Sequence, residues 1–354
     1  MDNNARILLV LNIICAFAIA FVAKEKLASQ PAKQPVVERP GPIVVEPEPI
    51  KEPNQPNIST PVPSYQDYDE VIAQLNEWHK EAPDMTEVGT YGKTSKGKDL
   101  YYMRFGNLYK KDSPKVLLFA AIHGNESIAT STMMAFSGTL LSKYKSDPEI
   151  TELLDTREVW LVPIVSPDSY PHSRWVDGVD PNRDFPSLRE PNRQSVPPCK
   201  ALQEFHLKHK FKAVLCGHSS GRWLLHPWSE IYEKCPHHDQ YVDLLGRMSK
   251  MCGYKVKKSS DFYPGRTIVG GACDWFYRQG CFSMTPEFGT HQRKSTDSEI
   301  KGELDRVYEA FILYLQEAPL IEVPVIGFQT PQTLLEGPVD RPPWQLPDLP
   351  DCNY

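Results

Sequence analysis

The sequence predicts an α/β fold with a mixed, largely parallel central sheet and helices on both of its faces. Uninterrupted apolar runs, which are typical of buried parallel strands, occupy 115–122, 157–165 and 211–217. Segments with helical spacing of their apolar residues precede, separate and follow these runs. Strands that alternate with helices form a sheet whose faces the helices cover.

Each element follows from the local pattern of apolar side chains. The strand runs read KVLLFAAI, REVWLVPIV and FKAVLCG, and a further apolar stretch, CFSMTPEFG, spans 281–289. Four segments have the pattern of helices, at 71–80, 127–144, 237–251 and 303–316. The sequence contains no internal repeat, so one domain of about 250 residues is expected.

Two proline-rich stretches flank this predicted domain. The first, at 30–64, cannot bury a core and is predicted to be an extended linker. The second, at 319–354, carries several bulky residues and is predicted to be a tail laid across the domain surface. The compact domain is therefore predicted to span 65–318.

The N-terminal segment 1–29 has the composition of a membrane-directed sequence. Its apolar run from Ile7 to Ala23 is interrupted only by Asn12 and has no polar stripe. At about 17 residues, the run lies at the lower limit for a spanning helix and also fits a signal peptide. We expect an exported protein, either anchored in a membrane by an uncleaved segment or periplasmic or extracellular.

Charge and cysteine usage narrow the classes of partner and site. The formal net charge of -6 and the pI near 6.0 give no basic field to gather phosphates, so nucleic acid is not an expected partner. Seven cysteines lie outside the N-terminal apolar run, and this odd number implies at least one free thiol. Their pairing cannot be read from the sequence. None of them forms a Cys-x-x-Cys pair, so a cysteine-rich zinc knuckle is not expected.

Two of the apolar runs lead directly into metal-ligating residue types. His123 and Glu126 follow the run 115–122, and His218 follows the run 211–217. Open α/β sheets bind ligands outside the carboxyl ends of their strands, so these side chains are expected to meet there. A lone His-x-x-Glu pair is a weak signal, because such pairs are common at helix starts. Two imidazoles and a carboxylate together are the three protein ligands of known catalytic zinc sites.

Other polar residues suggest hydrolytic chemistry near such a metal. Glu287 lies beside Pro286 in an apolar stretch, where desolvation is expected to raise its pKa toward the range of a general acid and base. The loop after 157–165 carries Arg174, Asn182 and Arg183, and arginine binds carboxylates and oxyanions. Taken singly, the arginines are more typical of ordinary surface ion pairs, and Glu287 of a solvated surface glutamate.

The ordered motifs over about 66–316 resemble those of the M14 metallocarboxypeptidase family. The motifs read HGNE, SPD, RW, GVDPNRDF, HSSG, GGACDW and PEF. The resemblance implies the zinc carboxypeptidase fold. It also implies one Zn²⁺ per chain, held by His123, Glu126 and His218.

The same resemblance implies roles for the remaining site residues. Glu287 would act as the base, and Arg174 would polarise the scissile carbonyl. Asn182 with Arg183 would clamp the terminal carboxylate of the substrate. Cys273 matches the position that selects the substrate side chain, and its small size argues against a pocket for basic side chains. Substrate-binding roles are implied for Asn182, Arg183, Ser219 and Cys273.

Two positions depart from the digestive members of the family. The segment RTIVGGACDW lacks their mobile tyrosine, although Tyr263 lies a little upstream. Asp184 replaces the second asparagine of their Asn-Arg-Asn sequence. The resemblance therefore leaves open how the site closes over its substrate.

The function implied is hydrolysis of a peptide bond near a free C-terminal carboxylate, with water activated by zinc and Glu287. The alternative within the family is an amidase that cuts the γ-D-glutamyl-diaminopimelate bond of murein peptides. Both substrates end in a carboxylate, so the predicted clamp does not discriminate between them. The expected partner is accordingly a peptide or a murein peptide.

Two hypotheses that do not involve zinc-dependent hydrolysis also remain. The stretch Gly217–Gly221 matches G-x-S-x-G, which would make Ser219 the nucleophile of a serine hydrolase, followed by Asp261 or Asp274 and by His291. That motif requires a helix directly after it, whereas the next residues, RWLLHPW, look extended. A non-catalytic binding domain on the same fold is the second hypothesis, since fold does not determine function.

Overall fold

The structure is a computed structural model. It describes residues 53–327 apart from 60, 62, 111, 263–264 and 290–293. The predicted membrane-directed segment 1–29 and most of the predicted tail, from 328 onward, lie outside the described residues. Among the helices within the described ranges, none is long and apolar enough to cross a membrane.

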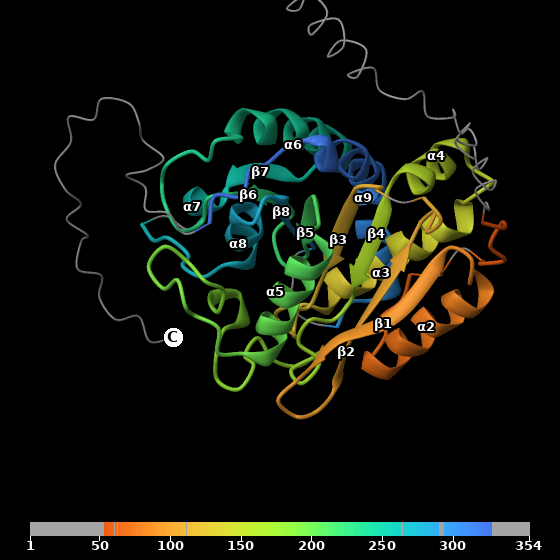
Figure 1. Ribbon diagram of the computed structural model, residues 1–354, viewed down its shortest axis with the longest axis horizontal. Helices are drawn as coiled ribbons and strands as arrows, with labels where there is room; N and C mark the ends of the chain where they lie inside the picture. The colour runs from red at the N-terminus through yellow and green to blue at the C-terminus, as the bar shows by residue number, and fades with distance from the viewer. Residues whose placement is uncertain are drawn as a thin grey trace, which may run out of the picture. The chain divides into compact units, whose positions relative to one another are not determined.

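An eight-stranded mixed sheet forms the centre of the described region (Figure 1). Its strand order is β1-β2-β4-β3-β5-β8-β6-β7. The central strands β4, β3, β5 and β8 are parallel, whereas β1 and β2 extend one edge antiparallel, and β6 pairs antiparallel with β8 and parallel with β7. The predicted mixed, largely parallel sheet is confirmed. The strands are β1 Thr86–Lys93, β2 Asp99–Phe105, β3 Lys115–Phe119, β4 Glu158–Val162, β5 Ala213–Cys216, β6 Trp223–His226, β7 Lys255–Lys258 and β8 Phe282–Glu287.

Helices cover both faces of this sheet, as the side chains of β3 illustrate. Val116 and Leu118 belong to one buried core with residues of α3 and α9, whereas Leu117 and Phe119 belong to a second core with residues of α5 and α8. In Figure 1, α5 and α8 lie in front of the sheet, and α3 and α9 lie behind it. Successive side chains of a strand point to opposite faces, which explains the uninterrupted apolar runs. The helices are α2 Tyr68–Glu81, α3 Ser127–Lys143, α4 Pro148–Thr156, α5 Pro197–His209, α6 His238–Cys252, α7 Ser259–Phe262, α8 Ala272–Arg278 and α9 Asp297–Glu317.

Local sequence signals determine where the helices near the sheet begin. α2 and α9 start with capping boxes, formed by Asp67 with Glu70 and by Thr296 with Glu299. α3 begins directly after Glu126, whose side chain makes no capping hydrogen bond although it occupies the cap position. The Glu126 carboxylate is therefore directed toward partners other than its own helix.

One residue of the predicted linker packs on the domain at its N-terminal side. Ile58, which falls in the predicted linker 30–64, is only 7% exposed and belongs to the core beside α2 and α3. Tyr170 also donates a hydrogen bond to the carbonyl of Gln66, at 2.8 Å. The packed region therefore begins before residue 65, because an extended proline-rich segment can still bury its occasional apolar side chain.

The start of the predicted tail also packs on the domain. Val323 is buried, and the Ile326 amide donates to the carbonyl of Arg278 at 2.9 Å. These contacts concern only the first residues of the predicted tail that the structure describes. All six cysteines among the described residues are free thiols.

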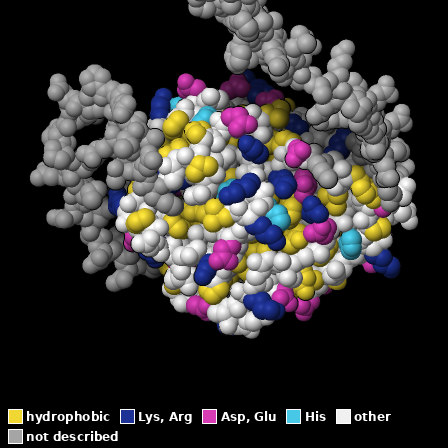
Figure 2. Space-filling view, in the orientation of Figure 1, with side chains coloured by type: hydrophobic (Ala, Val, Ile, Leu, Met, Phe, Trp, Pro, Cys, Tyr) yellow, Lys and Arg dark blue, Asp and Glu magenta, His cyan; other side chains and the backbone are white. Residues whose placement is uncertain are grey.

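Charges of both signs are interspersed on the face drawn in Figure 2. Lys and Arg side chains there lie close to Asp and Glu side chains, and the whole chain has a net charge of -6. A mixed surface of this kind does not focus a field of one sign on that face.

The buried position of Ile58 predicts a measurable contribution to stability. Replacing it by alanine removes buried methyl groups at the edge of the core and should lower the free energy of unfolding by about 2 kcal/mol. The matched control is Leu320→Ala, since Leu320 is 61% exposed, and it should change stability by less than about 0.5 kcal/mol. Urea unfolding of the full chain measures both, and equal effects would show that the segment around Ile58 does not pack on the domain.

Candidate metal centre

Three neighbouring strands of the sheet deliver the principal side chains of the site. β3, β5 and β8 lie side by side and parallel, and His123, His218 and Glu287 occupy or follow their carboxyl ends. The His218 amide donates to the Pro286 carbonyl at 3.0 Å, which ties the turn after β5 to the end of β8. The convergence follows from sheet geometry, since the carboxyl ends of parallel strands share one edge.

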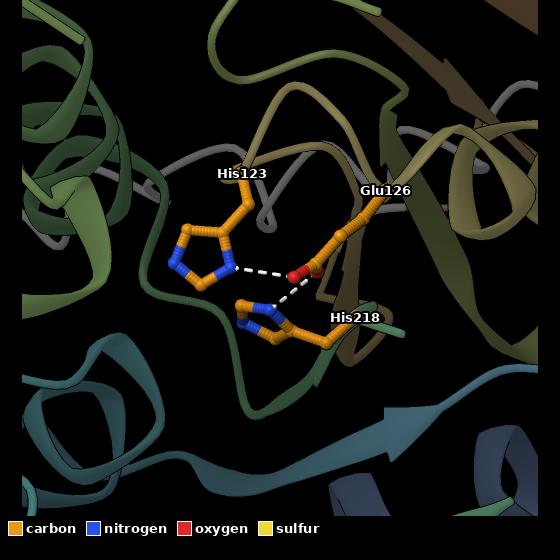
Figure 3. A group of neighbouring side chains, drawn as sticks. All are labelled: His123, Glu126 and His218. Carbon is orange, nitrogen blue, oxygen red and sulfur yellow. Dashed lines mark hydrogen bonds and ion pairs between the residues drawn. The ribbon is translucent and has the colours of Figure 1, made fainter. Parts of the chain in front are cut away.

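His123, Glu126 and His218 form one compact donor cluster (Figure 3). Both imidazoles face the Glu126 carboxylate, with Nδ1 of His123 2.8 Å from Oε1 and Nδ1 of His218 2.9 Å from Oε2. One ligand atom from each residue lies within 4.8 Å of the others, and all three side chains are buried. The predicted ligands therefore come together in space.

Burial and the neighbouring charges shift the pKa of each of the three donor side chains. Burial tends to raise the pKa of Glu126, but the two imidazoles and their hydrogen bonds outweigh burial and lower that pKa to about 2. Burial lowers the pKa of His218. Burial also opposes the charge on His123, yet Glu126 and Asp180 together raise its pKa. The carboxylate is therefore ionised at neutral pH, as a metal ligand must be.

Asp180 contacts His123 through the ring nitrogen that does not face Glu126. The sequence analysis did not identify it as a site residue. Its Oδ1 lies 2.9 Å from Nε2 of His123, and its Oδ2 accepts from Nε and the second terminal nitrogen of Arg174 at 3.0 and 2.7 Å. Metal-ligating histidines generally donate their other ring N–H to such a carboxylate, which fixes the ring. The available signal was the acidic residue two positions before Asn182 in GVDPNRDF.

The chemistry of this donor set fits a catalytic zinc ion. Zinc is bound by imidazole nitrogen and carboxylate oxygen, and catalytic sites combine three protein ligands with one open position. His123, Glu126 and His218 provide three such donors beside a cavity of about 310 Å³. The second nitrogen of His123 is already held by Asp180, as this use of the ring requires.

The cavity brings together every residue that the sequence nominated for the site. Its lining contains the three donors with Glu287, Arg174, Asn182, Arg183, Ser219 and Cys273. Residues that the sequence analysis did not nominate complete the wall. These are Ser220, Leu225, Ser229, Ser259, Phe262, Ile268, Gly271 and Thr285.

Glu287 lies at the end of β8, against the turn that carries His218. The two residues form an isolated parallel bridge. Burial raises the pKa of Glu287 well above its ordinary value, and the charge of Glu126 raises it further, while Arg174 lowers it. A carboxyl group whose pKa is raised in this way is suited to accept and return a proton.

A short 3₁₀ helix, Pro181–Arg183, places the two predicted clamp residues at the cavity. Asn182 Oδ1 accepts from the Ala272 amide at 2.9 Å, and its Nδ2 lies 3.2 Å from Nε2 of His218. Arg183 donates to the Asn182 carbonyl at 2.8 Å. The amide and the guanidinium therefore stand beside each other next to the donor cluster.

Asp184, which departs from the family pattern, has a structural role. Its carboxylate is fully buried and accepts from the Ser195 amide and hydroxyl and from the Val196 amide, at distances between 2.5 and 3.0 Å. These bonds fasten the loop before α5. Among the described residues that line the cavity Asp184 does not appear, so its carboxylate serves the loop and not the cavity wall.

The remaining nominated positions can also be placed. The Ser219 amide donates to Oε2 of Glu126 at 3.1 Å, which orients the carboxylate. Cys273 contributes its thiol to the wall, 3.6 Å from the Ser283 hydroxyl. Tyr263, considered above as a substitute for the mobile tyrosine, lies outside the described residues.

The arrangement around Ser219 does not match a nucleophile elbow. After Gly221 the chain enters strand β6 rather than a helix. The Asp274 carboxylate is buried and accepts from the amides of Ser229 and Glu230, and the exposed Asp261 pairs with Lys258 at 3.5 Å. His291 falls outside the described residues. The helix that the motif requires is thus replaced by a strand.

Known proteins share this sequence pattern. A family model described as zinc carboxypeptidase matches residues 71–310. Carboxypeptidase A4 of Mus musculus is 24% identical over 254 residues, which cover 61% of this chain and 60% of the relative. Carboxypeptidase B of Rattus norvegicus is 23% identical over 261 residues, 63% of each chain. The matched region thus spans about three fifths of the length of these two curated relatives.

Solved structures share the fold. Thrombin activatable fibrinolysis inhibitor superposes with a TM-score of 0.67 at 19% identity, covering 72% of this chain and 75% of that one. Carboxypeptidase A from Helicoverpa armigera gives a TM-score of 0.63 at 19% identity, covering 75% and 76%. At these identities the similarity supports the architecture of the sheet and its helices.

The contact between Asp180 and His123 predicts a loss of metal affinity on substitution. Asp180→Asn keeps the shape but removes the charge behind the ring, so zinc should bind about 10- to 100-fold more weakly. The control is Asp177→Asn on the same loop, whose exposed carboxylate accepts from the Ser95 hydroxyl. Competition with a chromophoric chelator measures both, and unchanged affinity in Asp180→Asn would contradict a supporting role.

Proposed function

Because the chain belongs to the zinc carboxypeptidase family, we propose that it is a metallocarboxypeptidase that hydrolyses the peptide bond next to a free C-terminal carboxylate. One observation carries the proposal. The His123, Glu126 and His218 cluster, the half-buried Glu287 and the pair Asn182 and Arg183 all border one cavity. A donor set for the metal, a proton carrier and a carboxylate clamp are the three parts that this reaction needs.

Glu287 is proposed to carry the proton. A zinc ion bound to the cluster would supply Lewis acidity and lower the pKa of a water molecule toward about 7. Glu287 would accept the proton of the attacking water and return it to the leaving nitrogen, which suits a carboxyl group whose pKa is raised by burial. Arg174, whose first terminal nitrogen lies 3.9 Å from Oε1 of Glu126, would stabilise the negative oxygen that develops on the carbonyl.

Asn182 and Arg183 are proposed to select the chain end. A guanidinium binds a carboxylate through two parallel hydrogen bonds, and the neighbouring amide adds a further donor. Since both groups stand on one short 3₁₀ helix beside the metal donors, a carboxylate held there would bring only the last peptide bond within reach. The fixed distance between clamp and metal would therefore give exopeptidase selectivity.

The cavity wall favours an uncharged C-terminal side chain. Away from the metal donors, the wall is formed by small or apolar groups, including Leu225, Ser229, Ile268, Cys273 and Thr285. A basic side chain would lose hydration there without gaining a carboxylate partner from these residues. The predicted export segment would direct the chain out of the cytoplasm. Its substrate there would be an ordinary peptide or a murein peptide.

Removal of metal or of Glu287 should abolish the reaction. Glu287→Gln keeps the side-chain volume but cannot accept a proton, so kcat/KM should fall by at least about 100-fold while zinc still binds. A chelator should abolish activity, and added zinc should restore it. Glu204→Gln, on the exposed side of α5, is the matched control. Mass spectrometry of peptides with uncharged C-terminal residues, and of a murein tripeptide, measures the products.

The products separate the candidate functions. Loss of single C-terminal residues from ordinary peptides would establish a general carboxypeptidase, and cleavage confined to the murein peptide would establish the amidase. Cleavage that survives both the chelator and Glu287→Gln would refute the zinc mechanism and direct attention to Ser219. Zinc binding without cleavage of either substrate would favour a binding domain.

The clamp predicts discrimination against peptides without a terminal charge. The unmodified chain should cleave a peptide with a free carboxylate far faster than the same peptide with a C-terminal amide. Arg183→Ala should remove most of this preference, mainly through a higher KM for the free acid, because the charge-assisted hydrogen bonds are lost. Arg189→Ala, on the nearby exposed loop, should keep it. Undiminished preference in Arg183→Ala would exclude Arg183 as the clamp.

A further inference from the structure

The turn that follows His218 is hydrogen-bonded to the main chain on both sides of Glu287. The Phe288 amide donates to the His218 carbonyl at 2.8 Å, and the Arg222 amide donates to the Glu287 carbonyl at 2.9 Å. The Gly221 amide donates to the Gly289 carbonyl at 2.7 Å. Because His218 is a metal donor and Glu287 is the proposed base, these bonds fix the distance between the two.

Arg222, the last residue of this turn, has a backbone conformation that L-residues rarely adopt. Its φ is +59°, in the left-handed region, and it directly follows Gly221, whose φ is +120°. A long side chain at such a position is strained, and strain of this kind persists only where the surroundings hold it in place. A glycine would adopt the same φ without steric cost, so the contacts of the arginine side chain must offset this strain.

The Arg222 guanidinium binds a buried carboxylate on a distant helix. Its Nε and one terminal nitrogen donate to Oε1 of Glu303 at 2.8 and 2.6 Å. Glu303 belongs to α9, its side chain is only 2% exposed, and its second oxygen accepts from the hydroxyl of Tyr254. The Arg222 carbonyl also accepts from the Lys255 amide at 3.0 Å. Helix α9 thus holds the turn through a buried carboxylate.

We propose that the Arg222–Glu303 ion pair is a positioning device for the reaction, which holds the 218–222 turn so that Glu287 stays in register with the metal donors. The proposal rests on the proposed function. Neither Arg222 nor Glu303 borders the cavity within the described residues, so both act through the main chain of Glu287 and His218. A misplacement of about 1 Å at a reacting group can cost 100-fold in rate.

The competing explanation is that the pair only ties α9 to the sheet. A second ion pair on the same helix provides the matched control. Arg247, on α6, donates to both oxygens of Glu317 at the end of α9, at 2.7 and 2.5 Å. It also fastens α9 to its surroundings, but neither residue borders the cavity. Glu303 is buried whereas Glu317 is partly exposed, so under a purely structural role the loss of activity in each variant would only follow its loss of stability.

The decisive variant is Arg222→Gly, which removes the guanidinium while leaving the positive φ accessible. We expect kcat to fall about 10- to 100-fold with KM and zinc affinity changed less than about twofold. Arg222→Lys restores the charge without the two-pronged contact and should recover part of kcat. Arg247→Ala should leave kcat unchanged. All rates are compared at a temperature where each protein is fully folded.

Amide hydrogen exchange gives a readout that needs no activity. In Arg222→Gly, the Phe288 amide should exchange at least tenfold faster than in the unmodified chain, whereas in Arg247→Ala it should not. If Arg222→Gly does not fold, the double variant Arg222→Gly with Glu303→Gln leaves no buried unpaired charge and takes its place.

The outcomes separate this inference from the proposed function. Unchanged exchange at Phe288, or faster exchange with unchanged kcat, overturns the positioning role. An equal loss of kcat in Arg247→Ala, or a parallel loss of zinc affinity in Arg222→Gly, also overturns it. An unmodified chain that binds zinc but cleaves no peptide refutes the proposed function, while hydrogen exchange still decides whether the pair holds the turn.

Discussion

The parallel pairing of β5 with β3 on one side and β8 on the other is the constraint on which the site depends. The register pairs Phe119 with Cys216 and Leu215 with Met284, so the three strands end almost level. His123, His218 and Glu287 then follow within a few residues of these paired positions. The apolar runs that fix this register are buried on both faces, so the packing that stabilises the sheet also places the site.

The acidic side chains of the site also depend on neighbouring groups that compensate their charge. Burying an isolated carboxylate is costly, and each acidic group here is matched by partners that lower the cost. Glu126 faces two imidazoles, Asp180 faces His123 and Arg174, and Asp184 accepts three hydrogen bonds from Ser195 and Val196. Glu287 differs, because burial and a neighbouring carboxylate raise its pKa. The one carboxyl group that is left poorly compensated is the one proposed to exchange a proton.

The sequence predicted the central strands and several helices because their signals are local and strong. The apolar runs that became β3, β4, β5 and β8 are buried on both faces, and α9 begins with a capping box. The edge strands β1 and β2 were missed, since half-exposed residues dilute their pattern. Ile58 packs on the core from an otherwise polar, proline-rich segment of the predicted linker, a contact that composition alone does not reveal. The roles of Asp180 and of the Arg222–Glu303 pair depend on contacts between distant segments, so the sequence around each residue does not reveal the partner, even where GVDPNRDF places an acidic residue near Asn182.

The central claim is that His123, Glu126 and His218 hold a single zinc ion beside Glu287. Its most direct test is a crystal of the domain grown with zinc and measured by anomalous diffraction on both sides of the zinc absorption edge. The account predicts one anomalous peak within about 2.0 to 2.2 Å of an imidazole nitrogen from each histidine and an oxygen of Glu126. Zinc bound at another cluster, or an anomalous map without a peak between these three side chains, would contradict it.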